Sequence, residues 1–299
     1  DRYYFLEVNP RLQVEHPVTE MVTGIDIVEL MLRIAAGDGL PVSQSDVRCS
    51  GHAVEARICA EDPANNFLPC TGELAYVKFP GAGIRVETGV ESKSVVSPFY
   101  DSMLAKLIAH ASTRDEALDK LAHALGETSI FGITTNQSFL TRLIGLPETR
   151  NATFHTRLID AQIDRLVDRK KEPDTEAMAL GACFWLTGQR PSAANNPWQS
   201  RETTGWQMAA GGDGLSPIPI LYLEAAGASA EIRFAPRQAD GTMSDAINDD
   251  KVSVRLVQGD GDRFTATIRS RREVVRIHQH NPTLFVHDLR GVHTLTAIP

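Results

Sequence analysis

The sequence has few of the features that mark secreted, membrane-spanning or nucleic-acid-binding proteins. Its four cysteines include no C-x-x-C pair, so neither a disulfide framework nor a metal cluster is predicted. No apolar run reaches the roughly 18 residues of a membrane span, and no secretory leader is expected. Lys and Arg number 30 against 38 Asp and Glu, which argues against a nucleic-acid or membrane surface as partner. We expect a cytoplasmic protein, or one of the mitochondrial matrix if it is eukaryotic.

The composition is that of a globular protein. The chain has 299 residues, of which 42% are hydrophobic and 23% charged, enough for about two domains at 100–200 residues each. Helical and strand patterns mix in the first half, and short strands dominate the second. The predicted fold class is therefore α+β.

Polar side chains near the start of the chain stand at every second position. They are Glu7, Asn9, Arg11, Gln13 and Glu15. Side chains alternate between faces along a strand, so an extended segment would place all five on one side. Pro10 interrupts the run, and we predict a strand ending near Asn9, then a bend and a loop that carries the last three.

These residue types suit phosphoryl transfer onto a small oxyanion. Glu7 and Asn9 offer oxygen ligands to a divalent cation such as Mg²⁺, which also takes oxygens from substrate phosphates. Arg11 is a permanently charged fork that fits a planar oxyanion, and Glu15 is near enough to act as a base. The plainer alternative is a ladder of Arg–Glu pairs on a solvated strand.

Periodicity predicts the remaining elements of the first half. Helices are expected over 23–36, 113–125 and 136–143, and strands over 51–60, 73–79, 84–88 and 106–110. Thr23 and Gly37 are expected to bound the first helix. Thr113 and Glu116 form a capping box for the second. Arg57 falls on one strand face with Glu55 and Cys59, where it could be a paired structural arginine.

The second half begins after a charged exit at residues 165–173. Asp174 caps an expected helix over 175–186 that is apolar almost all round, which predicts a buried central helix. Residues 188–214, with Trp198 and Trp206, predict a loop. Seven strands are then expected, over 220–224, 230–234, 252–257, 263–268, 273–280, 283–289 and 292–297. Seven or eight such strands indicate an antiparallel barrel or sandwich.

Four blocks of the sequence resemble biotin carboxylases. E-V-N-P-R-L-Q-V-E-H-P-V-T-E from Glu7 resembles the signature that ends their ATP-grasp domain. G-H-A-V-E-A-R-I-C-A-E-D-P from Gly51 resembles the start of their C-terminal domain. The third block is P-F-Y-D-S-M at residues 98–103, followed by Lys106, and the fourth is F-G-I-T-T-N at 131–136. The later helix and barrel resemble, in layout, the domain that joins this enzyme to the carboxyltransferase in acyl-CoA carboxylase α subunits.

The resemblance implies residues for the metal and for ATP. Glu7 and Asn9 match ligands of Mg²⁺ or Mn²⁺, and Glu7 also faces the ATP phosphates. Phe154 falls where the family places an apolar contact to adenine.

It also implies a pocket for bicarbonate and biotin. Arg11 matches the arginine that holds bicarbonate and stabilises the biotin enolate. Gln13 and the backbone amide of Val14 match the bicarbonate pocket. Glu15 matches the base that deprotonates bicarbonate, and Arg57 matches a second arginine for bicarbonate and the biotin ureido oxygen.

The implied activity is ATP-dependent carboxylation of biotin. ATP phosphorylates bicarbonate to carboxyphosphate, this yields CO₂ and phosphate, and the biotin enolate attacks CO₂. The implied partners are a carboxyltransferase β subunit and a biotinyl carrier domain. No A-M-K-M biotinylation motif occurs, so biotin is expected from another segment.

The implied layout has three parts. Residues 1–44 are expected to end an ATP-grasp domain, 45–165 to form the biotin carboxylase C-terminal domain, and 166–299 to form a subunit-linking domain. We expect a fragment that is inactive alone, from an α subunit of the methylcrotonyl-CoA type or its propionyl- and acetyl-CoA counterparts. The alternatives are a non-catalytic assembly module, a single-chain urea or pyruvate carboxylase, and another ATP-grasp ligase such as a carbamoyl-phosphate synthetase.

Overall fold

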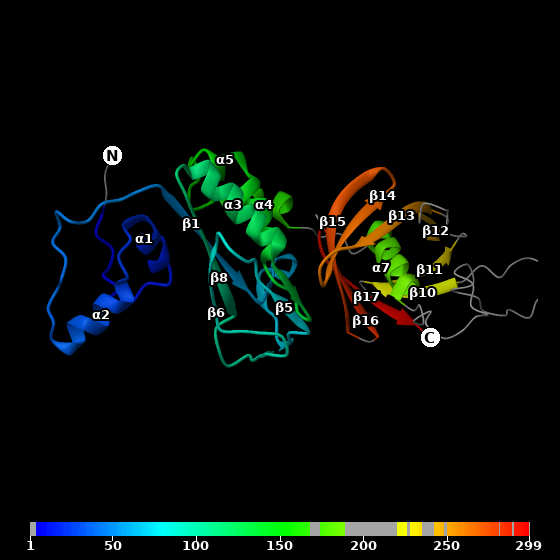
Figure 1. Cartoon of the computed structure of the whole chain (residues 1–299), viewed down its shortest axis with the longest axis horizontal. Coiled ribbons are helices and arrows are strands. Elements are labelled where there is room, and N and C mark those ends of the chain that lie inside the picture. The colour runs from blue at the N-terminus through cyan, green and yellow to red at the C-terminus, as the bar shows by residue number, and fades with distance from the viewer. Residues whose placement is uncertain are drawn as a thin grey trace, which may run out of the picture. The chain divides into compact units, whose positions relative to one another are not determined.

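The chain divides into two compact units, residues 1–168 and 169–299 (Figure 1). The computed structural model describes residues 4–167, 174–188, 220–225, 228–234, 242–247, 250–280, 282–288 and 290–298. The first unit mixes helices with antiparallel strands, and the second is a closed barrel around a helix, which confirms the predicted class. Most of the loop predicted at 188–214, including Trp198 and Trp206, lies outside the described residues.

The first unit contains six α-helices among its described residues. They are α1 (His16–Thr23), α2 (Ile27–Ala36), α3 (Arg114–Glu127), α4 (Gln137–Gly145), α5 (Pro147–Arg150) and α6 (Leu158–Leu166). Its longest strands are β1 (His52–Cys59), β6 (Arg85–Thr88) and β8 (Met103–Ala111), which form an antiparallel sheet in the order β1-β8-β6. Short pairs join β2 (Glu61–Asp62) to β3 (Leu68–Pro69), β4 (Gly72–Glu73) to β7 (Val95–Val96), and β5 (Tyr76–Lys78) to β9 (Ser129–Phe131).

The two faces of this sheet differ in chemistry. On one face, Ile58 and Leu107 are fully buried and belong to a core shared with Leu118, Leu121 and other residues of α3. Figure 1 shows α3 lying along the sheet. The capping box that starts α3 is present as predicted, with both reciprocal hydrogen bonds between Thr113 and Glu116. The opposite face carries charged side chains and is the floor of the candidate site.

Two sequence predictions for the start of this unit are wrong in detail. Residues 4–10 form no strand, because no described neighbour supplies ladder hydrogen bonds. The helix predicted from Thr23 starts at Ile27, because the Asp26 carboxylate accepts from the Glu29 amide and is its cap. Thr23 instead ends α1, a helix that was not predicted.

The strand expected over 73–79 is also split. Its two ends, β4 and β5, pair with different partners, β7 and β9. Gly132 follows β9 with a φ of +114°, and a Cβ there would lie 2.2 Å from the Glu73 carbonyl oxygen and 2.7 Å from the Ala75 nitrogen. Only glycine fits so close to the backbone that joins the two short strands.

The second unit is an eight-stranded antiparallel barrel closed around helix α7 (Thr175–Gly188). Its strands are β10 (Ile220–Ala225), β11 (Ala228–Phe234), β12 (Met243–Ile247), β13 (Asp250–Gln258), β14 (Arg263–Ile268), β15 (Arg271–His280), β16 (Thr283–Asp288) and β17 (Gly291–Ile298). Met178, Leu180 and Cys183 of α7 share one core with inward residues of the strands, which confirms the predicted buried helix. Strand β12 was not predicted, because M-S-D-A-I lacks a strand pattern.

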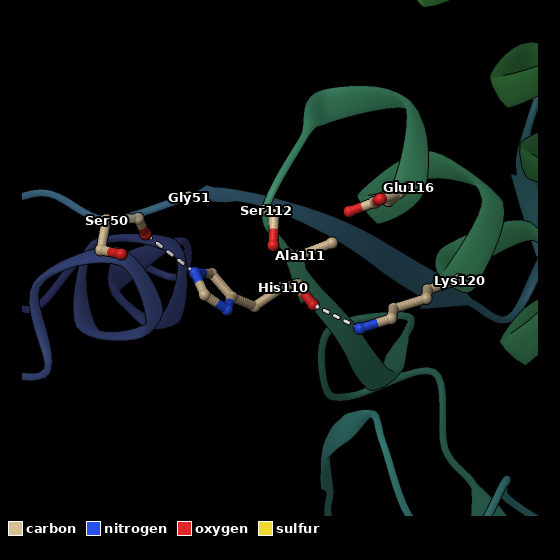
Figure 2. A pocket seen from close by; sticks show the side chains of 7 residues that line it. All are labelled: Ser50, Gly51, His110, Ala111, Ser112, Glu116 and Lys120. Carbon is tan, nitrogen blue, oxygen red and sulfur yellow. Dashed lines mark hydrogen bonds between the residues drawn. The ribbon is translucent and has the colours of Figure 1, made fainter.

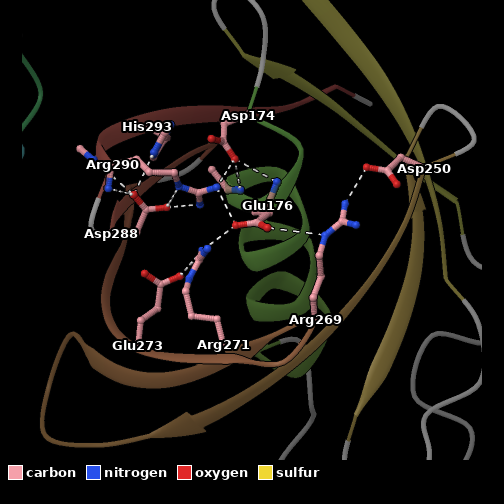
Figure 3. Close-up of polar contacts among 11 residues, drawn as sticks. Asp174, Glu176, Asp250, Arg269, Arg271, Glu273, Asp288, Arg290 and His293 are labelled. Atoms are coloured by element: carbon pink, nitrogen blue, oxygen red, sulfur yellow. Dashed lines mark hydrogen bonds and ion pairs between the residues drawn. The ribbon is translucent and has the colours of Figure 1, made fainter. Parts of the chain in front are cut away.

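A cluster of charged side chains ties the start of α7 to two turns of the barrel (Figure 3). Asp174 caps the helix by accepting from the amides of Glu176 and Ala177 at 2.9 and 3.0 Å. The Glu176 carboxylate meets Arg271 at 2.7 Å and Arg290 at 2.8 Å. Arg271 follows the β14–β15 turn and Arg290 precedes β17, so one carboxylate joins the helix to both turns.

Asp288 supports this cluster from inside the barrel. Burial alone would raise the pKa of this carboxyl, but hydrogen bonds from His293 and Arg290 outweigh burial and hold the pKa well below its usual range. Four histidines lie on strands β15–β17: His278, His280, His287 and His293. Within the described residues, no group of three or more His, Cys, Asp or Glu side chains could hold a metal.

Candidate functional site

The charged face of the β1-β8-β6 sheet supports the candidate site. Arg57, Lys106 and Glu87 are direct neighbours across the three strands. Because residues that pair across strands project to the same side, the three side chains form one row. Their neighbours in each strand, such as Ile58 and Leu107, point to the apolar core instead.

Two cations in this row hold the loop before α1. Arg57 Nη2 lies 2.7 Å from Glu15 Oε2, and the two side chains keep exposed fractions of 46% and 56%. Lys106 Nζ donates to the carbonyl oxygen of Val14 at 2.9 Å. The sheet thus holds the consecutive residues Val14 and Glu15 through Lys106 and Arg57. The Arg57 guanidinium and the Glu15 carboxylate stay open to solvent. The Glu15–Arg57 ion pair joins the first and second sequence blocks, because its two residues are 42 positions apart.

A chain of ion pairs extends from Lys106 to α1. Lys106 Nζ lies 2.5 Å from Glu87 Oε2, and Glu87 also pairs with Arg85, which contacts Glu20 of α1 at 2.8 Å. Burial would raise the pKa of Glu87, but hydrogen bonds from Lys106 and Arg85 lower it. Glu20 also accepts from the Ile27 amide at 2.7 Å. Both the loop and α1 are therefore fixed to the sheet by charge-assisted hydrogen bonds.

Glu55 stands beside Arg57 on the same face. Its Oε1 is 3.5 Å from Arg57 Nε, while its Oε2 is buried and has no hydrogen-bond partner among the described residues. Burial raises the pKa of this carboxyl, against the lowering effect of Lys106 and Arg57. On the same face, burial raises the pKa of the Cys59 thiol to about 11. Glu55 thus holds its proton more tightly than an exposed carboxyl does.

Asn136 fixes the strand that carries Arg57. Its Oδ1 accepts from the Cys59 amide at 2.9 Å, and its Nδ2 donates to the Arg57 carbonyl at 3.1 Å. Within the part of the chain that the structure describes, strand β1 is at the edge of the sheet, so these backbone groups have no strand partner on that side. The side chain of Asn136 replaces the missing strand, which gives the fourth sequence block a direct link to the site.

Glu7 and Asn9 lie together on the exposed segment before the loop. Asn9 Nδ2 is 3.4 Å from Glu7 Oε1, and a rotation of the amide would present its oxygen instead. One carboxylate and one amide oxygen at the surface fit a hard divalent cation that takes further oxygens from phosphates. The predicted pair of ligands is therefore adjacent, with donor types that suit Mg²⁺ or Mn²⁺.

The remaining predicted residues differ in their surroundings. Arg11 is exposed and donates to the neighbouring Leu12 carbonyl at 3.2 Å. The Gln13 carbonyl accepts from the His16 amide at 3.2 Å, which bends the chain into α1. The centroid of the Phe154 ring lies 6.0 Å from the guanidinium carbon of Arg114, at the start of α3.

A polar pocket opens elsewhere on the first unit (Figure 2). It is lined by Ser50, Gly51, His110, Ala111, Ser112, Glu116 and Lys120. His110 Nε2 lies 2.9 Å from the Ser50 carbonyl, and Lys120 donates to the His110 carbonyl at 3.0 Å. None of the predicted site residues lines this pocket.

Sequence reasoning did not assign roles to two residues that shape the site, Lys106 and Asn136. Both stood in recognised blocks, but a block does not say what its members contact. The alternation of side chains along a strand could have placed Lys106 beside Arg57, since two residues paired across β1 and β8 project to the same face. That signal required the register Arg57–Lys106, which a single sequence does not reveal.

Comparison with known families finds two matches, both within the first unit. Residues 55–161 match the family described as biotin carboxylase C-terminal domain. Residues 1–43 match the ATP-binding domain of the carbamoyl-phosphate synthase L chain. Residues 162–299, which include the whole barrel, lie outside both matched ranges.

Individual relatives agree. The mitochondrial methylcrotonoyl-CoA carboxylase subunit alpha of Mus musculus is 52% identical over 159 residues, which are 52% of this chain and 22% of that protein. Urea amidolyase of Saccharomyces cerevisiae is 47% identical over 161 residues, which are 54% of this chain and 9% of that protein. This chain thus spans a small part of each relative.

A solved structure shares the fold of this part. The biotin carboxylase domain of the Hydrogenobacter thermophilus 2-oxoglutarate carboxylase, in complex with MgADP, ADP and bicarbonate, is 40% identical with a TM-score of 0.54. The match covers 56% of this chain and 37% of that one. These findings confirm the resemblance predicted from the four blocks. Over about its first half the chain is similar to biotin-dependent carboxylases, and its residues 55–161 match the biotin carboxylase C-terminal domain family.

Proposed function

We propose that this chain supplies the bicarbonate- and biotin-binding side of a biotin carboxylase. The complete subunit would carboxylate biotin with bicarbonate at the expense of ATP. The observation that carries the proposal is the Glu15–Arg57 pair at 2.7 Å, half-exposed, on a sheet that fixes both residues. A base beside a guanidinium is what deprotonation of a bound small anion requires.

The roles of the anion-binding residues follow from their chemistry. Arg57 and Arg11 hold the charge of bicarbonate, and preorganised cations stabilise negative charge where it develops in the reaction. Gln13 and the Val14 amide supply neutral donors. On substrate entry, Glu15 Oε2 exchanges its bond with Arg57 for the bicarbonate hydroxyl and takes that proton.

The nucleotide residues form a second group. Glu7 and Asn9 would hold Mg²⁺ or Mn²⁺ against ATP phosphates, and Phe154 would contact adenine. When bound, ATP supplies the phosphoryl group and the cation neutralises its phosphates. We assign residues 1–44 to the end of the ATP-grasp domain and 45–165 to the C-terminal domain.

The catalytic proposal is tested in the full-length subunit that contains this chain. Bicarbonate-dependent ATP hydrolysis in the presence of free biotin is measured for wild type, Glu15→Gln and Arg57→Ala. Loss of a general base typically costs about 100-fold or more, so both variants should fall by at least that factor. Arg33→Ala is a matched control, because Arg33 forms a similarly exposed pair with Glu29 at 2.6 Å on α2. Equal activity in all four proteins would refute the assignment.

We further propose that residues 166–299 dock a carboxyltransferase β subunit, and that the substrate biotin arrives on a separate biotinyl carrier domain. The barrel is a closed unit with its own core, as an independent docking module requires. Mitochondrial relatives suggest the matrix as the location in a eukaryote, and the cytoplasm otherwise. Within the described residues, no helix is both long and apolar enough to cross a bilayer.

A pull-down with a cognate β subunit tests the docking proposal, comparing the whole chain with residues 1–165. Binding that requires residues 166–299 supports an acyl-CoA carboxylase α subunit. Absence of binding in both forms favours the alternative, a single-chain enzyme such as a urea or pyruvate carboxylase, which the match to urea amidolyase keeps open.

A further inference from the structure

The third sequence block contains a lysine for which the proposed reaction has no role. Lys106 follows P-F-Y-D-S-M and lies in the middle of β8. It is one of the few buried charged residues of the first unit, with 8% of its surface exposed. A buried lysine needs partners that offset its lost hydration. The partners of Lys106 therefore indicate its role in the site.

Both partners of Lys106 belong to the candidate site. One is Glu87, its cross-strand neighbour in β6, at 2.5 Å. The other is not a side chain but the carbonyl oxygen of Val14, at 2.9 Å and 92 residues away in sequence. Glu87 alone could neutralise the ammonium, so the bond to Val14 goes beyond charge compensation.

The bond to Val14 fixes the peptide plane that leads into Glu15. Because a peptide is planar, holding the Val14 oxygen also sets the direction of the Glu15 amide. The backbone at Glu15 then has little rotation left, since Val18 donates to the Glu15 carbonyl at 3.1 Å to begin α1. The Glu15 side chain therefore leaves the backbone in one direction, toward Arg57.

The sheet couples these two restraints. Lys106 and Arg57 are paired residues of adjacent strands, and paired side chains start about 5 Å apart. One holds the backbone before Glu15 and the other holds its carboxylate. We propose that Lys106 is a positioning residue for Glu15, which orients the Val14–Glu15 peptide so that the carboxylate meets bicarbonate; this inference rests on the proposed function.

The test uses Lys106→Met, which keeps most of the volume and removes the donor. Lys120→Met is the matched control, because Lys120 also donates to a backbone carbonyl, that of His110, at 3.0 Å. Lys106→Arg is the conservative variant, which retains a cation that can reach the Val14 oxygen. Thermal unfolding of each variant identifies proteins that fail to fold, and Lys106→Arg keeps the test valid if the Met variant is among them.

Two measurements are made. In this chain, hydrogen exchange reports on the amides of residues 13–16. In the full-length subunit, KM is measured separately for bicarbonate and for ATP. Loss of a charged donor to a site peptide should raise the bicarbonate KM or lower kcat by about 10- to 100-fold. Lys106→Met should also accelerate exchange at residues 13–16 and leave the ATP KM within about twofold, whereas Lys106→Arg should recover much of the loss and Lys120→Met should resemble wild type.

The outcomes separate the two levels of inference. A wild-type subunit without bicarbonate-dependent activity refutes the proposed function, and the role of Lys106 in it. With an active wild type, unchanged exchange, unchanged bicarbonate KM and unchanged kcat in Lys106→Met overturn the positioning role alone. Equal increases in the KM for bicarbonate and for ATP would also overturn it, because they indicate general loss of structure.

Discussion

Asn136 offers the sharpest test of how the site is held. Its side chain makes the two hydrogen bonds that complete the outer edge of β1, to the Cys59 amide and the Arg57 carbonyl, and the residue is 7% exposed. Asn136→Ala removes both partners and leaves a backbone donor and acceptor without them. Each such orphaned group costs about 1–3 kcal/mol. Water can reach part of the gap, so we expect the first unit to lose about 2–4 kcal/mol of unfolding free energy.

Urea unfolding of the whole chain measures this loss, with hydrogen exchange at residues 52–59 to separate the first unit from the barrel. Asn136→Asp refines the test, because it keeps the acceptor for Cys59 but places an oxygen opposite the Arg57 carbonyl. It should be no more stable than the Ala variant. The control is Asn65→Ala, which removes an exposed bond to Asp62 and should cost less than about 0.5 kcal/mol. An Asn136→Ala protein as stable as the control would refute the edge-capping role.

Three further predictions concern a close contact, a buried acid and the helix anchor. Gly132→Ala should destabilise the first unit by about 3 kcal/mol or more, because its Cβ would overlap backbone atoms. Gly81→Ala is the control, because a Cβ there faces open space. Equal unfolding midpoints for the two variants would contradict the prediction. Burial raises the pKa of Glu55 above its ordinary 4.5, so its ionisation opposes folding as pH rises through the folded-state pKa. Glu55→Gln should therefore stabilise the unit at pH 7 and lose that advantage below about pH 4.5, and a Gln variant less stable at pH 7 would reverse the sign. Glu176→Gln should cost the barrel about 1–3 kcal/mol and raise hydrogen exchange in both attached turns, and unchanged exchange there would show that the turns are held independently.

Local signals predicted much of the fold. Three local patterns predicted structure that is present. They are the capping box at Thr113, the helix-ending glycine Gly37 and the uniformly apolar helix after Asp174. Predictions failed where a local preference met a tertiary requirement. The alternating residues before Glu15 have a strand period, yet a strand without a neighbour gains no hydrogen bonds.

The site was predictable in composition but not in assembly. Recognition of the blocks named Glu15 and Arg57, and the structure brings them into contact. It could not show that Lys106 donates to a backbone oxygen or that Asn136 completes a strand edge, because these contacts join residues 77 or more positions apart. The chemical roles of all the predicted site residues stay predictions: Glu7, Asn9, Arg11, Gln13, Val14, Glu15, Arg57 and Phe154.

The two-faced sheet also limits which insertions and deletions this region can accept. Arg57 and Ile58 are successive residues of β1 that point to opposite sides, one to the site and one to the core. Removing or adding one residue upstream in β1 would exchange their places, and send a guanidinium into the apolar core. A change of two residues would keep each side chain on its face but shift the cation by nearly 7 Å along the strand. Length changes should therefore accumulate in the connecting turns of this domain, while β1 and β8 keep a constant length.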